Sequence, residues 1–188
     1  PRTRILWIGC GVTLSLVLPI LGSIVCAVGI PDSRLIDLSI HSLLETTGGL
    51  LAVLIAGILV VKQQTSGDES DAFLPWAASA LAAMGILDIF HAAVPQGNNF
   101  VWLHSAATLV GGVFFACVWI EASPGLRRML SYLPWLALGL ALLFAVGSCV
   151  LGEIVPAMTA ANEFTLLARS MNIVGGCGFF VAGAYFVR

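Results

Sequence analysis

Six apolar runs, each about as long as a helix that crosses a lipid bilayer, dominate this sequence of 188 residues. Such a helix needs about 20 consecutive, mostly apolar residues. The runs cover residues 5–28, 38–61, 72–94, 100–120, 129–151 and 166–187. A helix satisfies its backbone hydrogen bonds within its own segment, and the runs lack the alternation of a membrane barrel. We therefore predict an all-α integral membrane protein, a bundle of six transmembrane helices.

The composition also indicates lipid as the solvent. Charged residues make up 10% of the chain and hydrophobic residues 59%, with a mean hydropathy of +1.02, whereas soluble domains carry about 25% charged residues. A net charge of −2 argues against a nucleic-acid-binding protein. The five cysteines lie inside apolar runs without a CxxC pair, which is typical of small buried side chains and not of a disulfide framework.

The basic residues between the runs predict the orientation. Six spans put both termini on one side, and that side receives six of the eight basic residues: Arg2, Arg4, Lys62, Arg127, Arg128 and Arg188. The other side receives only Arg34 and Arg169. Because cytoplasmic loops are enriched in Lys and Arg, both termini are predicted to be cytoplasmic.

A weak internal repeat is visible in the second, fourth and sixth runs. In the second and fourth runs a histidine-serine pair precedes two glycines at the same spacing: His41-Ser42 before Gly48-Gly49, and His104-Ser105 before Gly111-Gly112. The sixth run has a version shifted by one residue, with Ser170 before Gly175-Gly176. The repeat predicts that the bundle consists of three successive helical hairpins. Alternatively, the glycines alone reflect close helix packing.

All three histidines of the chain fall at about the same predicted depth, near the outer, periplasmic face. His41 lies near the outer end of the second span, His91 near that of the third, and His104 one turn into the fourth. Glu45 follows His41 by four residues and Asp88 precedes His91 by three, so each carboxylate shares a helix face with its histidine.

Ionised carboxylates inside a membrane each cost about 2.5–3.5 kcal/mol, so we expect Glu45 and Asp88 to be compensated inside the bundle. The short connection at 95–99 predicts that His91 and His104 are neighbours. Three imidazoles with two carboxylates form a ligand set for a transition metal: His41, Glu45, Asp88, His91 and His104. Copper or zinc is expected before iron. The alternative is a polar network or proton relay without metal.

Four further residues are predicted to contact a bound ligand or cofactor. Arg169 and Asn172 lie near the outer end of the sixth span, and Ser42 and Ser105 directly follow two of the histidines. Arg169 is either an interfacial side chain that reaches toward water or the partner of a carboxylate, for which there are three candidates: Asp88, Glu45 and Glu163.

The segment MGILDIFHAAVPQGNNFVWLHSAATLVGGVFFACVW, residues 84–119, follows HSLLETTGGLLAVLIAGILV. Together they resemble the membrane-associated sensor domains (MASE-type, MASE3-like) of bacterial histidine kinases and diguanylate cyclases. The resemblance covers the second to fourth spans, and ARSMNIVGG of the sixth loosely. It implies a signal-input module of the bacterial inner membrane, not an enzyme, that continues after Arg188 into a cytoplasmic effector and dimerises through it.

The sequence therefore predicts one domain, residues 1–188, that binds a metal ion or a metal-held small ligand and signals through its last helix. Two alternatives remain. A ceramidase-like zinc hydrolase would use Asp88 or Glu45 as general base for a zinc-bound water. A haem-binding membrane protein would use two of the histidines as axial ligands.

Overall fold

The computed structural model describes residues 38–65, 71–121, 123–161 and 163–188. Its longer helices are α2 (Leu38–Thr65), α3 (Leu74–Ala93), α4 (Asn98–Ala116), α6 (Leu133–Val150) and α7 (Leu166–Val187). The shorter elements are α5 (Pro124–Leu130), the 3-10 turns η2 (Cys117–Trp119) and η3 (Gly152–Ile154), and the strands β1 (Thr159–Ala160) and β2 (Glu163–Phe164). The strands pair antiparallel.

Five helices of the described chain are long and apolar enough to cross a membrane: α2, α3, α4 with η2, α6 and α7. This confirms that the last five predicted spans are helices, and their length and apolar composition are those of a multi-pass membrane protein. The first predicted span, residues 5–28, lies outside the described residues, so the six-helix count and the cytoplasmic termini stay predictions. The predicted bounds of the last span agree with α7, whereas α6 begins later than predicted, with a proline in its first turn.

The connections contain more structure than the polar turns that the sequence predicts. Helix α5 lies in the connection before α6, and the β1–β2 hairpin lies in the connection before α7. Such short elements give no hydrophobic periodicity to detect. Thr165 joins the hairpin to α7: its Oγ1 accepts from the Ala168 N–H at 3.4 Å and donates to the Ala157 carbonyl at 3.0 Å. This is a standard N-terminal helix cap.

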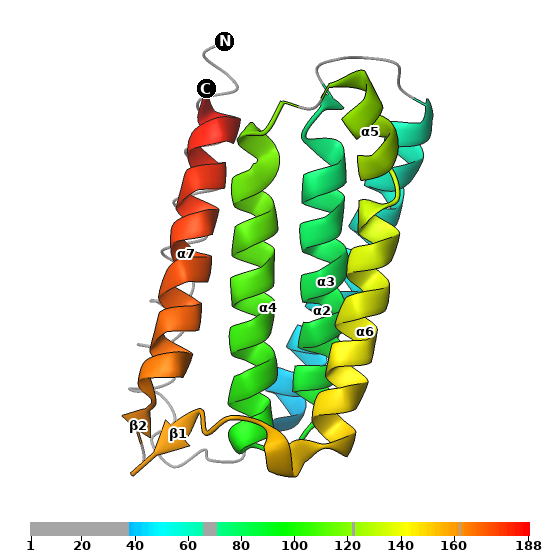
Figure 1. Cartoon of the computed structure of the whole chain (residues 1–188). Helices are drawn as coiled ribbons and strands as arrows, with labels where there is room; N and C mark the ends of the chain where they lie inside the picture. Colours follow the sequence, from blue (N-terminus) through cyan, green and yellow to red (C-terminus); the bar gives the residue numbers. More distant parts are fainter. Residues whose placement is uncertain (1–37, 66–70, 122, 162) are drawn as a thin grey trace, which may run out of the picture. The chain divides into compact units, whose positions relative to one another are not determined.

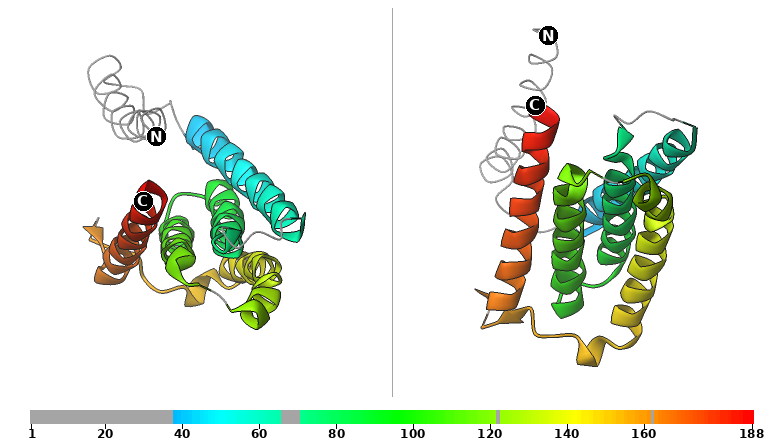
Figure 2. Two further views of the ribbon diagram at one scale, coloured as in Figure 1. Left: turned by 90° about the horizontal axis from the view of Figure 1, so that it is seen from above. Right: turned by 45° about the horizontal axis from the view of Figure 1, so that its top comes forward.

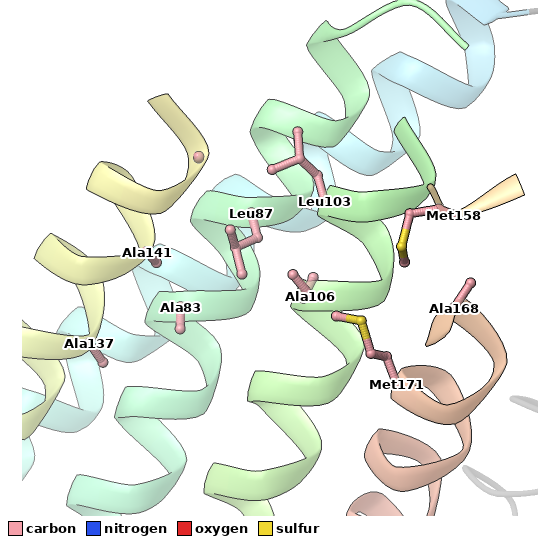
Figure 3. Close-up of a cluster of buried hydrophobic side chains, with 11 residues drawn as sticks. Ala83, Leu87, Leu103, Ala106, Ala137, Ala141, Met158, Ala168 and Met171 are labelled. Carbon is pink, nitrogen blue, oxygen red and sulfur yellow. The ribbon is translucent and has the colours of Figure 1, made fainter. Parts of the chain in front are cut away.

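Helices α3 and α4 form an antiparallel pair at the centre of the described bundle (Figure 1). Helix α6 packs along α3, α7 lies along α4, and α2 crosses α3 at a tilt (Figure 2). The buried cluster is rich in alanine, which lets helices approach closely. It includes Ala83, Leu87, Leu103, Ala106, Ala137, Ala141, Met158, Ala168 and Met171 (Figure 3). Many large apolar side chains instead face outward, as in a bundle surrounded by lipid.

Glycines set the closest helix contacts. A Cβ on Gly49 of α2 would lie 2.7 Å from the Gly85 carbonyl oxygen of α3. A Cβ on Gly112 of α4 would overlap the backbone of Gly175, and one on Gly178 would overlap that of Gly112. In both histidine-containing repeats the second glycine makes the backbone contact, and Gly111 packs against the Met84 side chain, so these glycines serve close helix packing.

Candidate metal centre

The connection between α3 and α4 brings two histidines together. Val94, which precedes Pro95, has the extended backbone (φ −91°, ψ 150°) that a following proline favours, and α3 therefore ends at Ala93. Helix α4 begins only a few residues later, so the last turn of α3 faces the first turns of α4. The rings of His91 and His104 lie 5.0 Å apart between centroids, which confirms that the short connection makes these residues neighbours.

Two asparagines at the start of α4 bind the last turn of α6 and the chain that follows it. Asn98 Oδ1 accepts from the Met158 N–H at 2.6 Å, and its amide donates to the Pro156 carbonyl at 2.8 Å. The Asn99 amide donates to the Ser148 carbonyl at 3.1 Å. These bonds anchor the segment that leads to the hairpin and α7.

Glu45 is the carboxylate shared by two histidines. Glu45 Oε2 lies 3.2 Å from Nε2 of His41, which precedes Glu45 by four residues on α2. The same oxygen lies 2.7 Å from Nε2 of His91 on α3. One ligand atom from each of the three side chains falls within 4.8 Å of the others, a group that could hold a metal ion. The side chain of His91 is 2% exposed, that of Glu45 24%, and that of His41 46%. The group therefore runs from a buried to an accessible side.

The hydrogen bonding of His91 determines which ring nitrogen faces Glu45 with a lone pair. His91 Nδ1 lies 2.7 Å from the Phe100 carbonyl oxygen. A carbonyl only accepts, so Nδ1 carries a hydrogen, and in neutral imidazole Nε2 then carries none. Two lone pairs would meet at the Nε2–Oε2 contact, and Glu45 Oε2 is buried without a hydrogen bond from any described residue. A proton or a metal cation between these atoms removes the repulsion.

Phe100 is the site residue that the sequence did not indicate. Its carbonyl holds His91, and its ring lies 3.8 Å from the His91 ring and 5.7 Å from the His41 ring, between centroids. A backbone acceptor leaves no mark on residue type. The only available signal is its place in the first turn of α4, directly after Asn98 and Asn99 and opposite the last turn of α3.

A cavity of about 510 Å³ lies beside this group. His41, Glu45, His91 and His104 line it at one end, and mostly apolar side chains line the rest. Besides α2, the helices α3, α4 and α7 contribute residues to the lining of this cavity.

The structure gathers three of the five predicted metal ligands. His104 lines the cavity beside His91, but it lies outside the group of three. Asp88 also lies outside it, one turn before His91, where it interacts electrostatically with Glu45. As metal ligands these two residues stay predictions.

Three of the four predicted ligand contacts line the cavity: Ser105, Arg169 and Asn172. Ser42 is not among its lining residues. The Asn172 amide donates to Ser105 Oγ at 2.9 Å, which joins α7 to α4. Arg169 pairs with Glu163 at 2.8 Å, one of its three candidate partners.

No protein-family model, curated protein or solved structure matches this chain. The resemblance to membrane-associated sensor domains therefore stays a prediction.

Proposed function

We propose that this chain is a membrane-embedded sensory module that binds copper or zinc through His41, Glu45 and His91. The observation that carries the proposal is the contact between Glu45 Oε2 and the lone-pair nitrogen of His91, whose other nitrogen donates to the Phe100 carbonyl. Metal-ligating histidines almost always donate their second N–H to a backbone carbonyl or carboxylate, because that bond orients the ring.

The composition of the site favours a metal with an exchangeable ligand. Two imidazole nitrogens and one carboxylate oxygen suit copper or zinc. Structural zinc sites usually have four protein ligands, whereas sites with three keep a position open for water or another molecule. Three protein ligands therefore fit an ion that keeps one coordination position for an exchangeable molecule.

The ion would act by joining helices. His41 and Glu45 belong to α2 and His91 to α3, so coordination draws these two helices together at this end. Their glycine contact, Gly49 against Gly85, lies about two turns deeper and serves as the pivot. An ion shifts such an equilibrium only if it binds the two packings with different affinity. Helix α7 shares the cavity and would carry the change to a cytoplasmic kinase or cyclase.

A cobalt titration of purified protein in phosphatidylcholine nanodiscs tests the metal site. Co²⁺ substitutes for zinc and reports its ligands by visible absorption. We expect one bound ion, and an affinity at least about 100-fold lower in Glu45→Gln and His91→Ala, a larger loss than removal of an outer hydrogen-bond partner causes. Thr47→Ala, on the exposed side of α2, is the matched control and should bind normally. Equal metal content in all four proteins would rule the site out.

Two native cysteines allow a test of signalling. Cys149 on α6 and Cys177 on α7 are exposed, and they carry spin labels once Cys10, Cys26 and Cys117 are replaced by Ala. Zn²⁺ should change the distance distribution between the labels, and Glu45→Gln should abolish that change. If Zn²⁺ binds and the distances stay the same, the ion is structural and the sensory proposal fails.

A further inference from the structure

The cavity beside the metal ligands is larger than an ion and its water require. Its volume of about 510 Å³ lies in the range of about 300–1,000 Å³ that small-molecule sites occupy. Beyond the histidines its lining is mainly apolar and includes Phe100, Val101, Phe164, Ala168 and Ile173. The space therefore suits a ligand with a polar head and an apolar body.

The charges at the polar end favour an anionic head. Glu45 is the only carboxylate among the residues that line the cavity, so a divalent ion beside it leaves one net positive charge at the cavity wall. Arg169 lines the same cavity, and its partner Glu163 is 75% exposed, so this ion pair contributes little and can be exchanged. A monoanion would neutralise the excess charge, which matters because uncompensated charge is costly at membrane depth.

Ser105 offers a hydrogen bond to such a head. It is fully buried and lines the cavity, and its Oγ accepts from the Asn172 amide. No acceptor for the Ser105 hydroxyl hydrogen occurs among the residues that the structure describes. A buried donor without an acceptor is unfavourable, and a carboxylate in the cavity would satisfy it.

From these observations we infer that the cavity binds a single-chain carboxylate amphiphile. Its carboxylate takes the open position of the metal and the Ser105 hydrogen bond, and its chain lies among the apolar side chains. This inference rests on the proposed function and deepens it, because it names the chemical class of the signal that the metal holds.

Octanoate added to the Co²⁺-loaded protein tests the inference. In phosphatidylcholine nanodiscs, whose lipid has no free carboxylate, octanoate should change the cobalt absorption bands saturably. Acetate, with the same head, should bind at least about 100-fold more weakly because each buried methylene adds affinity. Octan-1-ol, with the same chain length, should leave the bands unchanged. If acetate matches octanoate, or octan-1-ol gives the same change, the inference is overturned.

Cavity-filling variants locate the ligand. Val101→Trp on α4 should keep Co²⁺ binding and lose the octanoate response. Val110→Trp is the matched control, since Val110 is on the same helix but lines a separate cavity, and it should keep both. If Val101→Trp does not fold, Ile173→Trp at a 65% exposed cavity position replaces it. An octanoate response that survives in the folded variant overturns the inference.

The two proposals fail in different ways. A wild-type protein that binds no Co²⁺ contradicts the metal site itself. A protein that binds Co²⁺ through Glu45 and His91 but shows no octanoate response contradicts only the amphiphile. Ser105→Ala should weaken octanoate about 10-fold with Co²⁺ affinity unchanged, and equal octanoate affinity would exclude the Ser105 contact.

Discussion

The two ends of the helix bundle are closed by different chemistry. At the histidine end, where α3 ends and α4 and α7 begin, His41, Glu45 and His91 border a cavity. At the aromatic end, Trp119 Nε1 donates to the Val181 carbonyl at 2.9 Å, and its ring lies 5.2 Å from that of Tyr185. Phe73 packs against Phe186 there, with 5.5 Å between centroids.

The two ends differ in the chemistry of the buried group that lacks a hydrogen-bond partner. At the aromatic end Trp119 meets Tyr185 edge to face and its indole N–H has an acceptor, whereas Trp76 Nε1, in the first turn of α3, is buried without one among the described residues. The histidine end leaves a buried carboxylate oxygen without a donor from the described residues. We therefore expect a cationic ligand to change the packing most at the histidine end, where a carboxylate lines a cavity.

The largest effect is expected at the backbone contact of α4 with α7, which lies between the two ends of the bundle. In Gly112→Leu the new side chain would overlap the Gly175 backbone, so α4 and α7 must separate, and we expect a loss of about 3 kcal/mol or failure to fold. Thermal denaturation in detergent measures it. Gly176→Leu is the matched control, since nothing lies within 4 Å of its Cβ position. Equal destabilisation by both variants would contradict the proposed α4–α7 contact.

A moderate effect is expected at the aromatic end. Trp119→Phe keeps a ring but removes the N–H that binds the Val181 carbonyl, which should cost about 1 kcal/mol of stability. The Co²⁺ affinity should stay unchanged, because the metal ligands lie at the other end. A parallel loss of Co²⁺ affinity would mean that the two ends are not separable. Thermal denaturation and the cobalt titration together distinguish these outcomes.

A smaller effect is expected for the bond that joins α4 to α7 at the histidine end. A double-mutant cycle with Ser105→Ala and Asn172→Ala should give a coupling energy of about 0.6 kcal/mol, the average for hydrogen bonds between membrane helices. The cycle is measured by denaturation of the four proteins. A coupling energy of zero would show that the 2.9 Å contact does not stabilise the pair.

The smallest effect is expected for Arg169→Met. The ion pair with Glu163 is exposed on both sides, and such pairs contribute about 0–1 kcal/mol. The thermal midpoint should therefore barely change, while octanoate binding should weaken. Glu163→Gln is the control: it removes the same pair but leaves the cation, so it should not weaken octanoate. Equal weakening by both variants would assign the effect to the ion pair.

The sequence predicts the features that depend only on the lengths of segments along the chain. Bilayer thickness sets the length of a span, so the five described spanning helices were found, and a connection of a few residues requires antiparallel neighbours, so His91 and His104 were paired. Rotation about the helix axis is harder to predict. Residues four apart differ by about 40° and residues three apart by about 60° in the opposite sense. Glu45 therefore stays with His41, whereas Asp88 falls outside the group.

Other features depend on contacts that residue types do not report. The role of Phe100 is a backbone role, and any residue with a carbonyl at that position could perform it. Asn98 of α4 binds Met158, just before the hairpin, although the two residues lie about 60 positions apart in the chain. They meet because of the packing of α6 and α7. A polar turn residue looks the same whether or not it makes such a contact.

The bare backbone contact of α7 with α4 has a mechanical consequence. Most helix pairs interlock through side chains, and displacement along the axis then requires those side chains to climb over one another. Gly112, Gly175 and Gly178 present no side chains at the closest approach. Side chains outside this contact, such as Phe115 against Phe179 and Asn172 against Ser105, therefore set the axial position of α7 along α4.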